Sequence, residues 1–193
     1  THLFHSGTDV RTQVPMGLYG ALVVGRTPQD RVLVFSQIDP ALNAGTYTGG
    51  ARVSNWNPQY FLINGATAPG VADIAINLSE DTRLRFVNAG LETFVPTLGG
   101  GLYMDVIAED GNPYPYPLRQ YGLELQAGKT YDAIVNAGSA GTYAIYDRAL
   151  HLANGGLLAN IQAAPAAAAP VAFDDGYSVA EDGILTADGI APN

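Results

Sequence analysis

Short runs of apolar and β-branched residues, separated by glycine, proline and asparagine, recur along most of the chain. Several runs alternate apolar with polar positions, which is the pattern of a strand with one buried face. No stretch carries the longer apolar period of an amphipathic helix, so helix is expected to be minor. The runs predict strands at residues 31–38, 59–63, 84–87, 103–108, 129–135, 141–146 and 156–162. Together they favour an all-β antiparallel sandwich or barrel.

Turn-forming residues separate these strands and also indicate two domain boundaries. Asn64-Gly65 ends one run, and both residues tolerate the positive φ of a tight turn. Residues 25–30 interrupt two strands and are expected to form a joint between domains. Residues 163–170, AAPAAAAP, bury little surface and are stiffened by two prolines. They predict a linker.

Composition narrows the function classes. With 47% hydrophobic and 14% charged residues among 193, the chain is expected to fold as a globular protein. Its 18 acidic residues outnumber 9 basic ones, a balance that repels nucleic-acid phosphates and excludes DNA or RNA as a partner. No uninterrupted apolar run is long enough for a membrane span.

Cysteine is absent and Lys129 is the single lysine. The absence of cysteine excludes disulfides, thiolate catalysis and a copper site with a cysteine ligand within this chain. An acidic, lysine-poor and cysteine-free composition is expected of a secreted bacterial protein. Thr1 begins inside a motif, so the true N-terminus is expected to lie upstream.

The N-terminal segment carries the most specific motif. It contains His5-Ser6-Gly7 and, some ten residues later, the strand-like run GLYGALVV at residues 17–24. This pair resembles the closing hairpin of a multicopper oxidase domain, T-x-x-Y-H-S-H followed by G-L-Y-G-x-L-I-V. Gly7 stands where the family has a second histidine. The resemblance makes His5 a candidate copper ligand short of its partner; the alternative is a hydrogen-bonded histidine at a domain joint.

Further motifs resemble the same family in order and spacing. They are Tyr60-Phe-Leu-Ile-Asn-Gly65, Leu84-Arg-Phe-Val-Asn-Ala-Gly90, Val106-Ile-Ala-Glu-Asp-Gly111, the run 125–135 and Gly141-Thr-Tyr-Ala-Ile-Tyr-Asp147. The resemblance implies a cupredoxin-like Greek-key β-sandwich or barrel. Residues 1–27 are then the last strands of a preceding cupredoxin-like domain, and residues 28–162 form one complete domain.

The resemblance also shows which copper ligands the chain lacks. Family members need a cysteine-containing site and a cluster of histidines, whereas this chain offers His2, His5 and His151. At the family's H-C-H strand the sequence reads Tyr146-Asp147-Arg148, so an Asp147–Arg148 ion pair is expected in place of copper. After Gly90, where a copper-binding histidine is frequent, it reads Leu91-Glu92-Thr93.

The remaining histidines have weaker claims. His2 is a lesser candidate copper remnant, since strand alternation places it on the opposite face from His5. His151, near Asn154-Gly155-Gly156, is expected in a surface turn.

Three other groups have both a functional and a structural interpretation. Glu109 and Asp110 could be a catalytic carboxylate pair, but the EDGNP context favours a turn. The tip at residues 99–101 lacks the lysine of a phosphate loop. The tyrosines among prolines, Tyr114, Tyr116 and Tyr121, could bind glycans or a partner protein, or cover a sheet edge.

The acidic tail, residues 171–193, resembles the opening of a bacterial cadherin-like repeat of the type P-V-A-x-D-D-x-Y-S-V-x-E-D. Its candidate calcium ligands are the carboxylates of Asp174, Asp175, Glu181 and Asp182. A complete calcium site would need a neighbouring repeat.

Two functions of different classes follow. In the first, the chain is part of a secreted bacterial multicopper-oxidase-like protein, a family that oxidises phenols or metal ions and reduces dioxygen, and the chain alone is inactive. In the second, it is a copper-free structural, adhesive or filament-forming extracellular module. Its expected partners are further domains of a longer polypeptide or other copies of itself.

Overall fold

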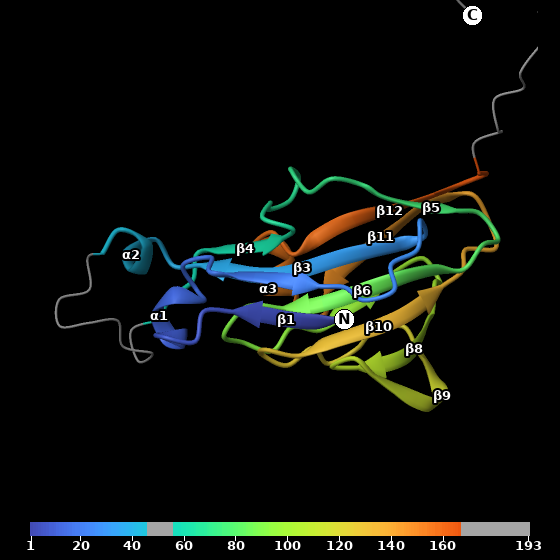
Figure 1. Cartoon of the computed structure of the whole chain (residues 1–193). Coiled ribbons are helices and arrows are strands. Elements are labelled where there is room, and N and C mark those ends of the chain that lie inside the picture. The colour runs from blue at the N-terminus through green and yellow to red at the C-terminus, as the bar shows by residue number, and fades with distance from the viewer. Residues whose placement is uncertain (46–55, 167–193) are drawn as a thin grey trace, which may run out of the picture.

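A six-stranded and a four-stranded sheet pack face to face in the computed structural model, which describes residues 1–45 and 56–166 (Figure 1). The first sheet has the order β4 (Tyr60–Ile63), β3 (Asp30–Ile38), β6 (Thr82–Asn88), β10 (Thr130–Val135), β8 (Met104–Glu109) and β9 (Asn112–Gln120). The second has the order β5 (Ile74–Asn77), β12 (Leu158–Ala164), β11 (Gly141–Asp147) and β7 (Pro96–Leu98).

The core lies between the two sheets. Three phenylalanine rings form its centre, with Phe35 at 6.2 Å from Phe86 and 5.9 Å from Phe94 between ring centroids. Ile145 and Ile161 of the smaller sheet pack against the same fully buried cluster. Strand alternation explains this arrangement, because every second side chain of a strand points to the same face.

The chain passes repeatedly between the sheets, so that most neighbours in a sheet are not consecutive in sequence. This crossing pattern confirms the predicted all-β, cupredoxin-like sandwich. The prediction of antiparallel pairing was wrong for two pairs, β3–β6 and β5–β12, which are parallel because the chain crosses to the other sheet between their strands. Helix is minor in the described residues, as expected: α1 (Val10–Gln13), α2 (Pro40–Asn43) and α3 (Leu150–Asn154) are each a single turn. Within the described residues, no helix is both long and apolar enough to cross a membrane.

Two N-terminal strands form a separate sheet on the outer face of the larger one. β1 (His2–His5) pairs antiparallel with β2 (Tyr19–Leu22), with His2 opposite Leu22 and His5 opposite Tyr19. β1 contacts β6 and β2 contacts β3, so this hairpin lies over the middle of the six-stranded sheet (Figure 1). The hairpin itself matches the sequence expectation; its assignment to a preceding domain stays a prediction.

The C-terminal boundary differs slightly from the predicted one. β12 continues through Ala164, and Ala163 is buried, so the last strand includes the first residues of the expected linker. The rest of the linker from residue 167 and the proposed calcium ligands Asp174, Asp175, Glu181 and Asp182 lie outside the described residues.

Candidate functional site

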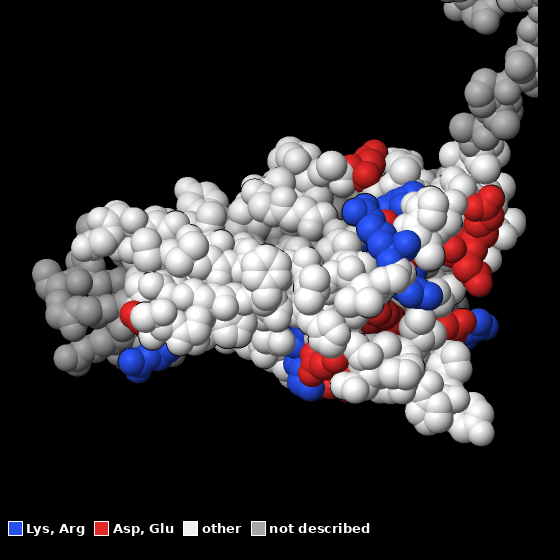
Figure 2. All heavy atoms as spheres, viewed as in Figure 1, with Lys and Arg blue, Asp and Glu red and all other residues white. Residues whose placement is uncertain are grey.

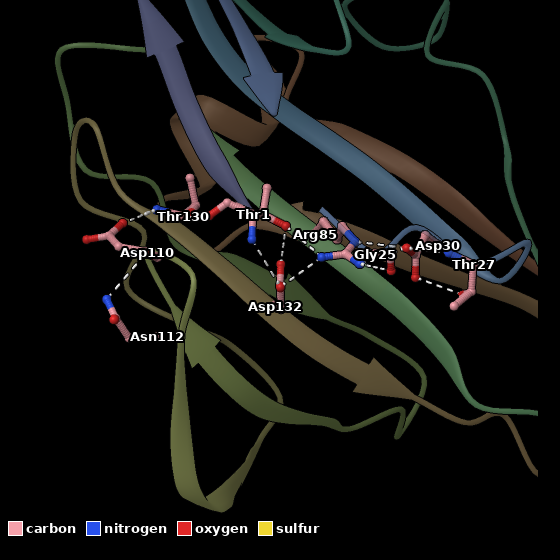
Figure 3. Close-up of polar contacts among 9 residues, drawn as sticks. All are labelled: Thr1, Gly25, Thr27, Asp30, Arg85, Asp110, Asn112, Thr130 and Asp132. Carbon is pink, nitrogen blue, oxygen red and sulfur yellow. Dashed lines mark hydrogen bonds and ion pairs between the residues drawn. The ribbon is translucent and has the colours of Figure 1, made fainter. Parts of the chain in front are cut away.

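A buried arginine with two carboxylates joins the N-terminal hairpin to the sandwich (Figure 3). Arg85 donates from Nε and Nη2 to Asp30 Oδ2 at 3.1 and 2.8 Å, and from Nη1 to Asp132 Oδ2 at 2.9 Å. The same Nη1 donates to Thr1 Oγ1 at 2.9 Å, and Nη2 reaches the carbonyl oxygen of Gly25 at 3.4 Å. Arg85 therefore contacts β3, β10, the segment that begins at Gly25 and the N-terminal residue of the hairpin.

Strand register places these groups together. Arg85 lies directly opposite Asp132 in the antiparallel β6–β10 pair, where cross-strand side chains meet. Leu84 and Phe86 point into the core, so Arg85 points to the other face, and the hairpin covers that face. On the hairpin side, the Thr1 hydroxyl donates to Asp132, and the Thr130 hydroxyl donates to the Thr1 carbonyl at 2.7 Å.

The charges in this network, which we call the Arg85 network (Thr1, Asp30, Arg85 and Asp132), compensate one another. Burial would raise the pKa of Asp30, but hydrogen bonds from the Thr27 amide at 3.0 Å and from Arg85 outweigh it and hold the pKa below 3.8. Asp30 is therefore ionised at neutral pH and pairs with a permanently charged guanidinium. All four residues are buried, so the network anchors the hairpin and offers no surface to a substrate.

Asp147, at the position of the family's copper-ligand strand, does not form the predicted ion pair with Arg148. Its carboxylate is fully buried and accepts hydrogen bonds from the backbone amides of Val95 at 2.8 Å and Ala149 at 2.7 Å. Arg148 is exposed, and its amide donates to the Val95 carbonyl at 3.0 Å. The prediction was wrong because unpaired backbone amides in the loop after β11 take the carboxylate. We call residues 147–157 the β11–β12 loop.

The second implied copper position is also engaged in hydrogen bonds. The Glu92 carboxylate accepts from Gln37 Nε2 at 2.8 Å, and the Leu91 amide donates to Gln37 Oε1 at 3.1 Å. Gln37 is buried, so this pair ties the segment after β6 to β3.

The three histidines lie apart in the fold. His5 is exposed at the end of β1, and its Nδ1 lies 2.8 Å from the Ser6 carbonyl oxygen. His2 points from the other face of β1, with its ring against Gly111 in the β8–β9 turn. His151 is exposed on α3. Within the described residues, no group of three or more His, Cys, Asp or Glu side chains could hold a metal ion.

Glu109 and Asp110 sit beside the β8–β9 turn, where Asp110 and Gly111 have φ of 48° and 78°. Lys129 Nζ pairs with both carboxylates, at 2.8 Å to Glu109 and 2.6 Å to Asp110. Burial and the Glu109 carboxylate, which accepts the Tyr114 hydroxyl at 2.9 Å, raise the pKa of Tyr114 to about 12. With both carboxylates already paired, the geometry favours the turn interpretation over a catalytic pair.

The outer face of the hairpin is apolar and exposed. Phe4 and Leu22 share this face and are 59% and 53% exposed, whereas Leu3 and Ala21 on the opposite face are only partly exposed. Figure 2 shows that the surface over β1 is largely uncharged, while charged side chains gather toward the other end of the molecule.

Two open pockets lie at opposite ends of β11. One, of about 500 Å³, is lined by residues 120–124 with Val95 and Arg148, beside the β11–β12 loop. The other, of about 550 Å³, lies where β6, β8 and β11 begin and is lined by Asp81, Tyr103, Asp105, Arg119, Asn136 and Tyr143, among others. The sequence singled out neither pocket.

The sandwich and its strand order define a cupredoxin-type domain, and comparison with known proteins identifies its family. The family model for multicopper oxidases matches residues 37–168. The chain therefore belongs to the multicopper oxidase family. No curated protein sequence gives a significant match.

Solved structures with the same fold include a blue copper oxidase from Nitrosomonas europaea, with 23% identity and a TM-score of 0.72 over 83% of this chain and 55% of that one. The multicopper oxidase mgLAC has 22% identity and a TM-score of 0.72, over 91% of this chain and 58% of that one. A copper nitrite reductase from Nitrosomonas europaea has 18% identity and a TM-score of 0.64, over 84% of this chain and 61% of that one. This chain thus spans little more than half the length of these structures.

The residues present do not fit the family's copper ion. Asp147 and Glu92 stand at the two implied ligand positions and are already bound to amide groups. Copper sites of this family combine imidazole and thiolate ligands. The chain has no cysteine, and its three histidines are dispersed.

Proposed function

We propose that this chain is a copper-free structural domain of a longer, secreted multicopper-oxidase-like protein. The observation that carries this proposal is the position of Asp147, whose two carboxylate oxygens hold the β11–β12 loop through backbone amides. This arrangement keeps the loop of a copper site folded without a metal. Any oxidation of phenols or metal ions then depends on copper held by other parts of the polypeptide.

The outward face of the hairpin supports a role in assembling those parts. Phe4 and Leu22 expose apolar surface that an adjoining domain would bury, at about 25 cal/mol per Å² of apolar area. His5 and His2 are both exposed on β1, so both remain candidate copper ligands, in a site shared with another domain.

A copper titration of the isolated chain tests the proposal. After incubation with Cu²⁺ and dialysis, we expect far less than one equivalent of copper by metal analysis, no visible copper–thiolate band and no oxidation of a phenolic dye. His2→Ala and His5→Ala serve as the controls for weak binding at the two exposed imidazoles of the hairpin. Retention of a full equivalent of copper by the wild-type chain would contradict the proposal.

The exposed hairpin also favours a second candidate, an extracellular module that assembles with copies of itself. An unpartnered two-stranded sheet offers an edge as well as an apolar face to another chain. Sedimentation velocity over a range of concentrations separates the two. Self-association that Phe4→Ser abolishes would favour the module, and a monomer at all concentrations would favour the domain of a longer protein.

A further inference from the structure

The pocket at the start of β11 has the construction of a binding site, and nothing in the proposed function uses it. It lies toward the end of β11 opposite Asp147, and its lining residue Tyr143 is about 14 Å from Asp147 along the strand. Its volume of about 550 Å³ falls within the range of about 300–1,000 Å³ typical of ligand sites. Strand ends and the tight turns between them supply its lining.

Planar polar groups converge on this pocket. Arg119 donates from Nε and Nη2 to the two oxygens of Asp105 at 2.9 and 2.8 Å, which fixes both side chains in one plane. The Asn136 amide donates to Asp81 Oδ1 at 3.0 Å on the opposite wall. Arg119 is 72% exposed, so its remaining N–H donors face solvent, as does the second oxygen of Asp81.

Aromatic rings form the apolar part of the lining. Tyr103 is 54% exposed and is held by an edge-to-face contact with Tyr121, 6.3 Å between centroids at 75°. Tyr143 packs against the backbone of Gly100, where a Cβ atom would come within 2.9 Å of its ring. Its hydroxyl donates to the Ser139 carbonyl at 2.8 Å. Both rings are therefore positioned before any ligand arrives.

The charge of the lining selects among ligand classes. Asp81 and Asp105 against Arg119 leave one net negative charge, on a chain of net charge −9, which disfavours an anionic ligand. The predominance of polar groups disfavours a purely apolar ligand, whose binding would leave them without hydrogen bonds. A neutral ligand with paired hydroxyls and an apolar ring face satisfies both parts of the lining.

We propose that this pocket binds a neutral carbohydrate. Carboxylate, amide and guanidinium groups offer pairs of hydrogen-bonding atoms that match vicinal hydroxyls. The exposed face of Tyr103 would cover the C–H face of a sugar ring, because an aromatic side chain supplies large contact area at low entropic cost. The proposal does not depend on the absence of copper from the chain.

Affinity gel electrophoresis of the full chain tests the proposal. The gels contain laminarin, xylan, starch or hydroxyethyl cellulose, and soluble chitin oligosaccharides are tested by calorimetry. We expect at least one neutral glycan to bind, and Tyr103→Ala and Asp81→Asn each to weaken that binding at least tenfold. The matched control is Tyr116→Ala, which removes an equivalent tyrosine that is 79% exposed and lies outside the pocket.

Thermal melting of each variant separates lost binding from lost folding, because Tyr103 and Asp81 lie on the surface and their substitution is expected to leave the melting temperature unchanged. No binding to any of these glycans would overturn the proposal. Equal losses in Tyr103→Ala and Tyr116→Ala would also overturn it.

Discussion

Arg85 illustrates how one residue can connect segments that lie far apart in sequence. Its guanidinium bonds Asp30, Asp132 and Thr1, and its side chain is 1% exposed. Desolvating three charges costs several kcal/mol for each ion, so the arrangement is favourable only while every partner is present. The network therefore specifies where the joint and hairpin lie more than it adds to overall stability.

Removing the guanidinium should be severely destabilising. Arg85→Met leaves the buried Asp30 carboxylate without a counter-charge, and we expect the free energy of unfolding to fall by about 3–5 kcal/mol. Arg119→Met is the matched control, since it breaks a comparable bidentate pair whose arginine is 72% exposed, and its effect on stability should be much smaller. Urea denaturation of both variants measures the difference. Similar losses would show that the burial of Arg85 has no energetic consequence.

The lowered pKa of Asp30 predicts how stability depends on pH. Its pKa is below 3.8 when folded, so its contribution is present above about pH 5 and is lost as the pH falls through the folded value. We expect Asp30→Asn to be less stable than wild type at pH 7, with the difference shrinking toward pH 3. Asp105→Asn, in a more exposed pair, should show a smaller difference. An Asp30→Asn difference that is constant with pH would contradict the assignment.

At the scale of elements, the β11–β12 loop is stabilised by a carboxylate that caps backbone amides. Val95 is joined to this loop in both directions, since its amide donates to the Asp147 side chain and its carbonyl accepts from the Arg148 amide. Both hydrogen bonds hold the loop against Val95, the residue that precedes β7. The local order depends on Asp147 and not on the charge of Arg148.

Substitutions in this loop distinguish amide capping from an ion pair. Asp147→Ala removes two hydrogen bonds to a buried carboxylate, each worth about 1.5–3 kcal/mol, so a loss of roughly 3–6 kcal/mol is expected. Arg148→Ala should change stability by less than about 0.5 kcal/mol, because its side chain is exposed. Denaturant melts of the two variants and the double variant provide the measurement. Equal losses in the single variants would restore the ion pair.

Strands with a clear alternation were predictable, and those without one were not. The pattern placed β3, β6, β10 and β11 to within two residues. It missed β9, whose sequence NPYPYPLRQ contains three prolines, because proline is compatible with a strand only at a sheet edge, where this one lies. It also missed β5 and β7, which are too short to show a period.

The same pattern explains why the Arg85 network was missed. In Leu84-Arg85-Phe86-Val87, alternation indicates that the arginine leaves the core, which is correct, but an outward face is normally solvated. The hairpin that covers this face is separated by some 60 residues of chain from Arg85, and sequence periodicity carries no information on such packing. The signal in the sequence was charge alone, since Arg85 and Asp132 are ionisable residues within predicted strands and Asp30 directly precedes one.

For the whole molecule, the hairpin has two faces with different roles. The inner face, with Thr1, bonds to Asp132 and Thr130 on the six-stranded sheet. The outer face exposes Phe4 and Leu22. An isolated two-stranded hairpin is marginal in water, so the contacts of the inner face are what hold it on the domain. The outer face is then free to pack against another domain, as proposed above.

Deleting residues 1–24 should destabilise the sandwich, because Asp132, Thr130 and Arg85 each lose a hydrogen-bond partner beneath the hairpin. We expect a loss of a few kcal/mol, at about 0.5–3 kcal/mol for each bond according to its charge, measured by urea denaturation. The matched control is the double variant Phe4→Ser, Leu22→Ser, which alters the outer face alone and should leave unfolding of the sandwich unchanged. If the deletion leaves both the unfolding midpoint and the oligomeric state measured by sedimentation unaltered, the hairpin does not stabilise the domain. If instead the double variant is as unstable as the deletion, the outer face is part of the fold, and the surface offered to another domain has to be sought elsewhere.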